Sequence, residues 1–442
     1  MIVMKFGGSS VANAERMNHV ASIITSYAEK KPLVVLSAMG DTTDHLLEAA
    51  ELAQKTGVVD ISGVEKLHRD TAKELKIDIP AVDELFEELI SLLTGISMLK
   101  ELTKRTRDYL VSFGERLSVR MMSAFLNSIG TKSKFYDAWD AGFISDSQFM
   151  SAELLDEVWT KIPNAFKDYT SGKQQEIPIV TGFIAKDKAG NITTLGRGGS
   201  DLTATMLGAT LRVDEIQTWK DVNGILTTDP RIVEDAKTVP IVTYEEAAEL
   251  AFFGSQVLHP RSMMPCRKTG TPVRVKNSYN IESPGSLIVE RHGSLPPPVR
   301  AITAVKGVSV IDICSTRMLG ASGFMAHIFN QFLKHDISVD VVATSEVSVS
   351  STVKTDKDLS PLCADLSNVA DVEVHHEKAI ITIICDVHRS SEILSTCFTA
   401  LNNVGINVQM ISQGASKVNI SMMCQEEESK RVITVLHKAF WG

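Results

Sequence analysis

The chain has 442 residues, of which 44% are hydrophobic and 22% charged, a composition typical of a soluble globular protein. Its length exceeds one typical domain and predicts two or three. The net charge of -9 argues against a nucleic-acid-binding protein, which usually carries a basic face. Because no apolar run reaches transmembrane length and no signal peptide precedes the chain, we expect a cytoplasmic protein with no membrane partner.

The cysteines give no sign of a metal site or of disulfides. None of the six belongs to a C-x-x-C pair, and several lie within apolar patterns. We expect them to be small core side chains in a reducing compartment, and we predict no protein-bound metal. They are Cys266, Cys314, Cys363, Cys385, Cys397 and Cys424.

The first ten residues, MIVMKFGGSS, are the most informative stretch of the chain. An apolar run followed by two glycines predicts a buried strand that enters a tight turn. Gly7 and Gly8 lack a Cβ atom, so the backbone there can approach a ligand closely. A helix-like pattern begins near Val11, and a helix N-terminus favours phosphate, beside which Lys5 would add a full positive charge. An ordinary strand and turn with a solvated lysine is the alternative, and the Walker A order is absent.

Further strands and helices alternate through the first part of the chain. The region 43–127 has leucines at three- and four-residue spacing and is predicted to be largely helical. Such alternation predicts a parallel sheet covered by helices on both faces, with ligands bound at the carboxyl ends of the strands. The predicted strands are 33–37, 177–183, 216–221 and 271–275.

Three prolines and a glycine within 291–300 predict an exposed connector, and the pattern changes after it. Two successive β-α-β-β-α-β units follow, each close to the ferredoxin-like arrangement, although one irregular α+β domain is the alternative. The first unit has predicted strands at 307–313, 337–342 and 346–350 and helices at 322–335 and 359–369. The second has predicted strands at 379–384, 406–410 and 417–421, a helix from about 391 and a final helix.

Two strings in the first part carry groups suited to binding an amino acid. The string SFGERLS at 112–118 places Glu115 beside a glycine, and a carboxylate is the expected partner of an amine. The string TTLGRGGSDLTA at 193–204 surrounds Arg197 with glycines, and a guanidinium matches a carboxylate. Asp201 could form an ion pair with Lys5. The alternatives are a solvated glutamate and a surface turn whose Ser200 or Asp201 caps a helix.

Two more strings follow in the chain. WKDVNGILTTDPR at 219–231 contains an Asn223-Gly224 turn, and a hairpin-like loop is its ordinary explanation. FGSQVLHP at 253–260 contains His259. We expect this histidine to be structural, because a carboxylate nucleophile is already ionised at neutral pH and needs no base.

The string KFGGSS at 5–10 and these four later strings, in this order, resemble those of aspartate kinases, a branch of the amino-acid kinase family. The resemblance covers essentially the whole chain and implies a three-layer αβα kinase domain with a mainly parallel sheet. It implies that Lys5 and Asp201 are catalytic, with Lys5 on the transferring phosphoryl group and Asp201 orienting it. The implied substrate-binding residues are Ser37, Thr43, Glu115, Arg197, Gly198, Gly199 and Ser200. The implied ATP-binding residues are Lys5, Gly7, Gly8, Ser9, Lys220, Asp221, Leu226, Arg231 and Gln256.

The resemblance implies phosphoryl transfer from ATP to the β-carboxylate of L-aspartate, at the entry to lysine, threonine and methionine synthesis. Mg²⁺ would arrive on the ATP phosphates. Many family members have lysine in place of Gln256 and threonine in place of Lys220, so we expect Lys220 to compensate for the missing charge. Two alternatives remain, a kinase of the same fold acting on glutamate, N-acetylglutamate or a nucleotide, and a non-catalytic amino-acid sensor. The length leaves no room for a fused homoserine dehydrogenase.

The last third resembles a tandem pair of ACT domains, which sense amino acids. The resemblance implies domains at 1–293, 300–378 and 379–442, with the two ACT units possible as an interleaved pair, and a homodimer formed through them. It also implies inhibition by L-lysine, with threonine as the second choice. The implied effector residues are Met318, Gly323, Phe324, Ser338, Val339, Asp340, Ser345 and Glu346.

Overall fold

The computed structural model describes residues 1–253, 258–292, 297–315, 323–414 and 416–442. The chain divides into two compact units. The first consists of Met1–Ile225, Pro240–Tyr244 and Val257–His292, and the second of Leu226–Val239, Glu245–Gln256 and Gly293–Gly442.

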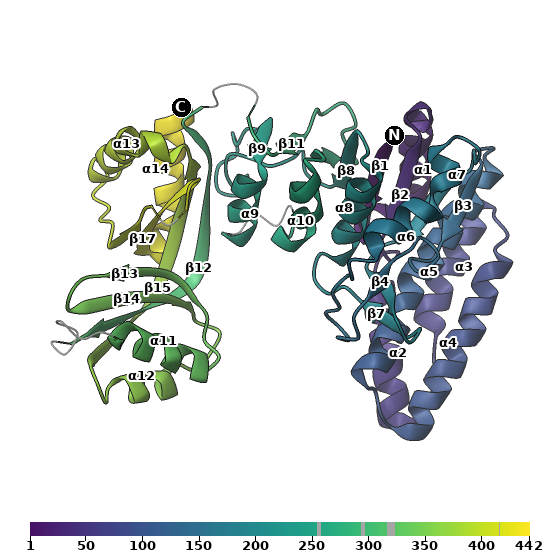
Figure 1. Cartoon of the computed structure of the whole chain (residues 1–442), viewed down its shortest axis with the longest axis horizontal. Helices are drawn as coiled ribbons and strands as arrows, with labels where there is room; N and C mark the ends of the chain where they lie inside the picture. The colour runs from purple at the N-terminus through teal and green to yellow at the C-terminus, as the bar shows by residue number, and fades with distance from the viewer. Residues whose placement is uncertain (254–257, 293–296, 316–322, 415) are drawn as a thin grey trace. The chain divides into compact units, whose positions relative to one another are not determined.

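The first unit is built on an eight-stranded sheet with the order β3-β5-β2-β1-β8-β10-β11-β9 (Figure 1). Neighbouring strands are parallel, except that β10 and β11 are antiparallel. The predicted, mainly parallel sheet is therefore confirmed. Its strands are β1 (Ile2–Phe6), β2 (Pro32–Leu36), β3 (Ser133–Tyr136), β5 (Ile177–Thr181), β8 (Glu215–Lys220), β9 (Ile241–Thr243), β10 (Val273–Asn277) and β11 (Ser286–Val289).

Helices cover both faces of this sheet, as a three-layer fold requires. Five helices pack with one face of β1 and β2 into a large apolar core: α1 (Ala14–Ser26), α2 (Thr42–Thr56), α3 (Ser62–Leu75), α4 (Pro80–Leu99) and α5 (Lys104–Ser128). The helix α8 (Gly199–Leu211) packs against β1, β2 and β8, and α10 (Pro260–Thr269) packs on α8. The central strands β1 and β2 are buried along their whole length, which explains why their sequences, apart from Lys5, are apolar rather than alternating.

A smaller three-stranded sheet with the order β4-β6-β7 also belongs to the first unit. It consists of β4 (Ile144–Ser145), β6 (Ile184–Asp187) and β7 (Ile192–Thr194), and the short helices α6 (Val158–Ala165) and α7 (Lys167–Thr170) lie between β4 and β5 in the chain. The strand β7 leads directly into the glycine-rich string that precedes α8.

The second unit has one six-stranded antiparallel sheet with the order β13-β14-β12-β15-β17-β16. Its strands are β12 (Val299–Cys314), β13 (Val339–Thr344), β14 (Ser348–Lys354), β15 (Asp371–Cys385), β16 (Met410–Ser412) and β17 (Asn419–Gln425). Its helices are α11 (Phe324–Lys334), α12 (Ser360–Leu366), α13 (Ser390–Asn402) and α14 (Ser429–Trp441), together with α9 (Tyr244–Phe252), most of which belongs to this unit.

The two long strands β12 and β15 join two ferredoxin-like halves. The end of β12 pairs with β14 and the start of β15, while the start of β12 pairs with the end of β15, which in turn pairs with β17. Each half has its own apolar core, one with α11 and α12 and the other with α13 and α14. This pairing supports the interleaved version of the predicted domains, in which residues 299–305 join the second half although they precede the first in the chain.

Two segments that precede residue 293 fold with the second unit. Thr227 accepts a backbone hydrogen bond from the Ile302 N–H at 2.7 Å, and its hydroxyl lies 2.9 Å from Nε2 of His437 on α14. Arg300 and Glu246 form a buried ion pair at 3.4 Å. The contacts therefore divide the chain differently from its order in sequence.

The predicted strand at 406–410 is largely wrong, because only Met410 is in a strand, and β16 extends to Ser412. Gly405 has a positive φ of 70° and ends the turn after α13, and the chain first joins β17 where Gln409 N–H donates to Met423.

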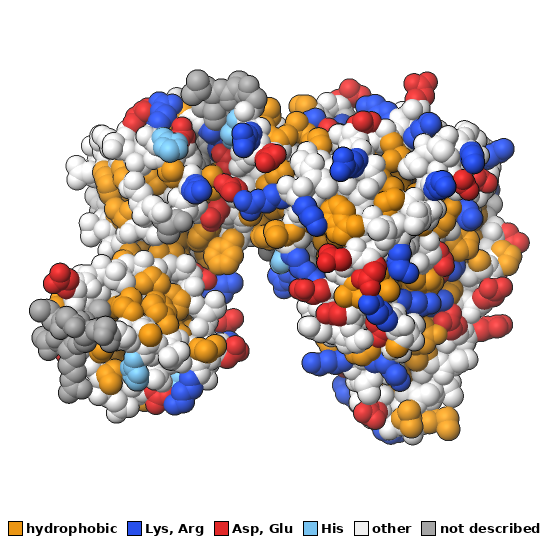
Figure 2. Space-filling view, in the orientation of Figure 1, with side chains coloured by type: hydrophobic (Ala, Val, Ile, Leu, Met, Phe, Trp, Pro, Cys, Tyr) orange, Lys and Arg blue, Asp and Glu red, His pale blue; other side chains and the backbone are white. Residues whose placement is uncertain are grey.

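Charged side chains of both signs are interspersed on the face drawn in Figure 2. Among the helices of the described segments, none has the length and apolarity to cross a membrane.

Candidate active site

The carboxyl ends of β1, β2 and β8 meet at one edge of the first sheet, and the predicted motifs follow these ends. The turns after β1 and β2 are joined by backbone hydrogen bonds from Ser37 N–H to Phe6 and from Gly40 N–H to Gly8, both 3.2 Å long. A Cβ atom on Gly8 would lie 2.7 Å from the carbonyl oxygen of Ala38. Only glycine therefore permits these two turns to pack so closely.

Lys5, on β1, forms a buried ion pair with Asp201, in the first turn of α8. The Lys5 Nζ lies 2.9 Å from Asp201 Oδ1, and both side chains are 9% exposed. Lys220, the last residue of β8, places its Nζ 3.9 Å from the other carboxylate oxygen of Asp201. One carboxylate therefore lies between two lysines from two strands of the sheet.

The charges in this cluster determine its protonation. Burial alone would raise the pKa of Asp201, but the positive charges of Lys5 and Lys220, with a contribution from His259, lower it below its usual value. Burial lowers the pKa of Lys220, and Asp201 partly offsets that effect. Asp201 is thus held as a carboxylate, which orients the Lys5 side chain near the end of its strand.

Arg197 is presented by a tight loop between β7 and α8. Gly198 has a φ of 73°, and a Cβ atom there would lie 2.7 Å from that of His259, so the loop requires glycine. The Arg197 side chain is exposed and forms no ion pair with any described residue. In the next turn, the Ser37 hydroxyl donates to Ser200 Oγ at 3.0 Å, which joins the ends of β2 and α8.

Glu115 is buried in α5 beside the turn after β2. Its Oε1 accepts the Ala38 N–H at 3.1 Å, while the buried Oε2 has no hydrogen-bond partner among the described residues. Burial raises the pKa of Glu115 to about 8, against the lowering effects of the Ala38 N–H and of Lys5. Gly114 allows this approach, because a Cβ atom at this position would lie only 2.7 Å from the Cβ atom of Ala38. An incompletely satisfied buried carboxyl of this kind is suited to an amine.

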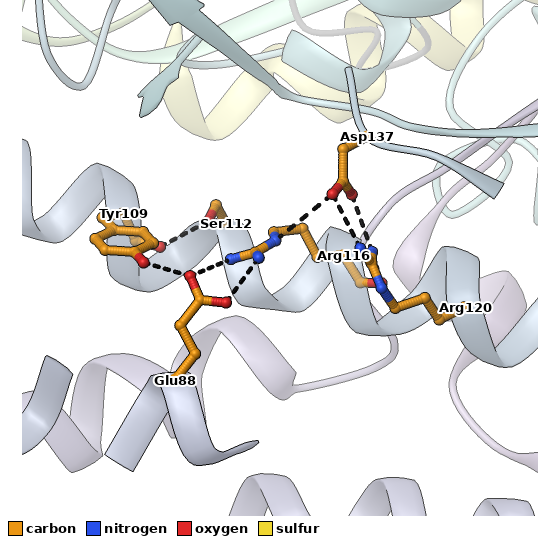
Figure 3. Close-up of polar contacts among 6 residues, drawn as sticks. All are labelled: Glu88, Tyr109, Ser112, Arg116, Arg120 and Asp137. Atoms are coloured by element: carbon orange, nitrogen blue, oxygen red, sulfur yellow. Dashed lines mark hydrogen bonds and ion pairs between the residues drawn. The ribbon is translucent and has the colours of Figure 1, made fainter. Parts of the chain in front are cut away.

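A polar network fixes α5 along the side shown in Figure 3. Arg116 donates to both oxygens of Glu88 on α4, at 3.2 and 2.8 Å, and Tyr109 also donates to Glu88. Arg120, one turn further along, donates to both oxygens of Asp137 at 3.0 Å. These paired charges hold the helix that carries Glu115 to its neighbours.

The other predicted substrate and nucleotide residues are distributed over both units. Thr43, in the first turn of α2, has its hydroxyl 3.7 Å from the position of a Cβ atom on Gly114. Gly7, Gly8 and Ser9 form the turn after β1, and Ser9 and Asp221 are exposed. Leu226 and Arg231 belong to the second unit, where Arg231 pairs with Asp229 at 2.7 Å, and Gln256 lies outside the described residues.

The turn after β5 lies at the site edge, but its residues Gly182 and Phe183 were not among the predicted site residues, although the strand itself was predicted. Phe183 has a positive φ of 67°, and its ring would lie 2.8 Å from a Cβ atom on Gly199. Gly182 lets α8 approach, because its Cβ atom would lie 2.7 Å from that of Ser200. A strained residue beside a binding loop often marks a functional site, and Gly182 at the carboxyl end of a parallel strand was the available signal.

His259 has the structural role that we expected. It is the N-cap of α10, where its Nδ1 accepts the Arg261 N–H at 3.2 Å. No three His, Cys, Asp or Glu side chains of the described segments gather in a way that could hold a metal ion.

The predicted effector residues lie around α11 and β13 in the second unit. Gly323 is the N-cap of α11, with a φ of 92°, and Phe324 is the first residue of this helix. Ser338 precedes β13, which contains Val339 and Asp340, and burial raises the pKa of Asp340. Ser345 and Glu346 are exposed in the turn that follows, and Met318 lies outside the described residues.

Known proteins resemble the chain over its whole length. A model of the amino acid kinase family matches residues 1–277, and an ACT domain model matches residues 381–440. "Aspartokinase 1, chloroplastic" of Arabidopsis thaliana is 49% identical over 99% of this chain and 80% of its own length. "Lysine-sensitive aspartokinase 3" of Escherichia coli is 32% identical over 99% of this chain and 98% of its own length.

Solved structures agree with the sequence relatives. The structure of E. coli aspartokinase III with lysine and aspartate, in its T-state, gives a TM-score of 0.82 at 30% identity and covers all of both chains. A second, R-state structure with aspartate and ADP gives 0.79 at 30% identity, again over all of both chains. These similarities show that the chain is a kinase and belongs to the aspartokinases, a branch of the amino acid kinase family that carries C-terminal ACT domains.

Proposed function

We propose that this kinase transfers the γ-phosphoryl group of ATP to the β-carboxylate of L-aspartate and forms 4-phospho-L-aspartate. The observation that carries the proposal is the buried Lys5–Asp201 ion pair at the sheet edge, in the same unit as the unpaired Arg197 and the buried Glu115. The E. coli relative was solved with aspartate in both of its states, which supports the choice of amino acid.

Each end of the amino acid has a matching group. Arg197 offers a planar fork of donors for the α-carboxylate. Glu115 offers the free oxygen Oε2 to the ammonium group. The hydroxyls of Ser37 and Ser200 lie between the ends of β2 and α8, where they can donate to the same ligand. With both ends held, only the side-chain carboxylate of aspartate is left to react.

The chemical step needs positioning and charge more than acid–base catalysis. The acceptor carboxylate is already ionised at neutral pH. Lys5 stabilises the negative charge that develops on the transferring group, and Asp201 keeps Lys5 in place. Lys220 adds a second cation beside Asp201 and supplies the phosphate contact that Gln256 lacks the charge to make.

ATP fits the turn after β1. Gly7 and Gly8 leave the backbone bare, and Lys5 provides charge beside them. When bound, ATP supplies the phosphoryl group, and Mg²⁺ would enter on its phosphates, since Asp201 is already engaged by two lysines. The relative solved with ADP supports the choice of nucleotide.

We extend the proposal to regulation by L-lysine, with threonine as the second choice. The E. coli relative is named lysine-sensitive, and its structure was solved with lysine. Asp340 offers a half-buried carboxyl to an amine, and the α11 N-terminus at Gly323 offers N–H groups to a carboxylate. We also predict that the protein acts in lysine, threonine and methionine synthesis and that it is located in the cytoplasm.

A homodimer formed through the ACT domains is part of the same proposal. The strand β13 lies at an edge of the six-stranded sheet, where its outer backbone groups can pair with a second strand. Val342 on this strand and Val347 beside it are exposed apolar side chains.

Trapping the product tests the proposed reaction. Hydroxylamine converts an acyl phosphate into a hydroxamate, so the purified protein with ATP, Mg²⁺ and L-aspartate should form aspartyl hydroxamate. The Lys5→Ala variant should remain folded and lose about 100-fold or more of the rate, because it lacks the charge at the reacting group. A folded Lys5→Ala variant with normal turnover, or a wild-type protein that forms no hydroxamate, would contradict the proposal.

A further inference from the structure

The loop that precedes Arg197 is held from two sides by charged residues that lie outside the predicted motif strings. Asp108 contacts it from α5, and Arg261 contacts it from α10. The sequence separates these residues widely, and the fold brings both to the backbone of residues 194–195. Neither has a role in the reaction described above.

Asp108 is buried and accepts three hydrogen bonds. Its Oδ1 accepts the Thr194 hydroxyl at 2.8 Å, and its Oδ2 accepts the Thr194 N–H at 2.9 Å. The same Oδ2 accepts the Met150 N–H at 2.8 Å. Asp108 thus joins the end of β7 to the segment around Met150.

Arg261 joins the same two segments from the other side. Its Nη1 donates to the Leu195 carbonyl at 2.8 Å, and its Nη2 donates to the Ala152 carbonyl at 2.6 Å. A planar guanidinium donates these two bonds in a fixed geometry, which a lysine could not reproduce.

Three backbone hydrogen bonds also hold the loop on either side of Arg197. Ala152 N–H donates to the Thr194 carbonyl and Leu195 N–H donates to the Phe183 carbonyl, at 2.9 and 2.8 Å. Gly199 N–H closes the turn on Gly196 at 3.0 Å. These bonds restrict the backbone next to Arg197, while the Arg197 side chain forms no ion pair with any described residue.

The helix α5 relates this loop to Glu115. Asp108 and Glu115 are seven residues apart on α5, which is about 10 Å along a helix axis at 1.5 Å per residue. The network of Figure 3 holds α5 to Glu88 and Asp137, so the helix is a fixed support for both residues. A group that attaches the Arg197 loop to α5 therefore sets the distance between Arg197 and Glu115.

We propose that Asp108, assisted by Arg261, is a positioning residue that fixes Arg197 relative to Glu115 and so selects ligands with the carboxylate-to-ammonium spacing of an α-amino acid. The inference rests on the proposed function, in which Arg197 and Glu115 hold the two ends of aspartate. Asp108 contacts no substrate and acts through Arg197.

The first test compares two replacements of Asp108. In Asp108→Ala the loop loses two hydrogen bonds and the segment around Met150 loses one. KM for aspartate should therefore rise about tenfold or more while KM for ATP stays within about twofold. In Asp108→Asn the amide oxygen can accept both N–H groups and the NH₂ can donate to the Thr194 hydroxyl. The asparagine variant should therefore restore KM for aspartate to within about threefold of wild type. Lys104→Ala, an exposed change on the same helix, is the control and should alter neither constant.

A double-mutant cycle separates positioning from general support of the fold. If Asp108 acts through Arg197, then Asp108→Ala in an Arg197→Ala background should lower kcat/KM for aspartate by less than about twofold further. Full additivity of the two losses would overturn the proposal. Equal increases in KM for aspartate and ATP in Asp108→Ala would overturn it as well.

Milder variants keep the test available if Asp108→Ala does not fold. Thr194→Val removes only the hydroxyl group whose hydrogen bond Asp108 accepts. Arg261→Gln cannot donate to the Leu195 and Ala152 carbonyls together, so it breaks the bridge between the loop and the second segment. Both should raise KM for aspartate selectively, and unchanged constants in both would overturn the proposal. A wild-type protein that does not phosphorylate aspartate would instead contradict the proposed function, so the two failures are distinguishable.

Discussion

Glu115 shows how one buried side chain can set a pH dependence. With a pKa raised to about 8 by burial, its carboxyl is mainly neutral at pH 7 in the free protein. A neutral carboxyl attracts an ammonium group weakly, so binding of aspartate should be coupled to loss of this proton. The bound ammonium would then stabilise the carboxylate as the partner of a buried ion pair.

The sign of the resulting pH effect follows directly. Protonated Glu115 predominates below pH 8, so apparent KM for aspartate should fall as pH rises from 6 to 8, by at most about tenfold per pH unit, and level off above the pKa. Initial rates at saturating ATP measure this dependence. Glu115→Gln should have a high KM with no such slope, and a wild-type KM that stays constant over this range would contradict the role of Glu115.

Lys220 is the residue whose predicted role depends on a departure from the family pattern. Its Nζ lies 3.9 Å from Asp201, close enough to share the charge environment of Lys5. If it replaces the cation that Gln256 does not provide, Lys220→Thr should raise KM for ATP and Gln256→Lys should partly restore it. Strictly additive effects in this double-mutant cycle would argue against compensation.

At the scale of elements, β13 is the part of the second unit that the proposed regulation needs most. Asp340 on this strand is half-buried, and burial raises its pKa, although the charge of Lys354 lowers it in part. An amine ligand would restore the ionised form and would have to bind the inactive arrangement more tightly than the active one.

Asp340→Ala should therefore lose inhibition by lysine and keep kcat and KM for aspartate near wild type. Activity measured against millimolar lysine, and separately against threonine, provides the test. If wild-type activity does not respond to lysine and falls with threonine, then lysine is the wrong effector. If the Asp340→Ala variant remains fully sensitive to lysine, then the effector site lies elsewhere.

The elements of the first unit were predictable because their patterns are local. The mostly apolar runs of β1, β2 and β5 identify strands buried on both faces, and the glycines that follow β1 and β5 identify the site edge. The predicted ion pair of Lys5 with Asp201 depended on their opposite charges and on the family resemblance, because Asp201 follows a strand of the smaller sheet. The structure places the two side chains in contact.

Other features depended on tertiary contacts that no local pattern carries. Asp108 occurs within an unbroken helical sequence, and its two partner residues, Met150 and Thr194, lie 42 and 86 residues further along the chain. The predicted strand at 406–410 has suitable residues, yet its pairing with β17 begins only at Met410. Here the partner strand, rather than β-propensity, determines where the strand starts.

At the scale of the whole molecule, the chain order and the compact units differ. Two segments of the sequence matched by the amino acid kinase family, Leu226–Val239 and Glu245–Gln256, fold with the unit that contains the ACT sheet. The first overlaps the predicted nucleotide string at 219–231 and contains its last residue, Arg231. A boundary at residue 293 therefore describes the sequence pattern better than it describes the packing.

The central claim is that the site selects aspartate among similar carboxylic acids. The direct measurement is kcat/KM for L-aspartate, L-glutamate and N-acetyl-L-glutamate in one ATP-coupled assay with the full chain. N-acetyl-L-glutamate lacks the ammonium group that Glu115 needs, and the extra methylene of L-glutamate moves its side-chain carboxylate out of place while Arg197 and Glu115 hold the other two groups. L-aspartate should therefore exceed both others by about 100-fold or more. A protein that prefers L-glutamate or N-acetyl-L-glutamate, or that hydrolyses ATP with none of the three, would contradict the account.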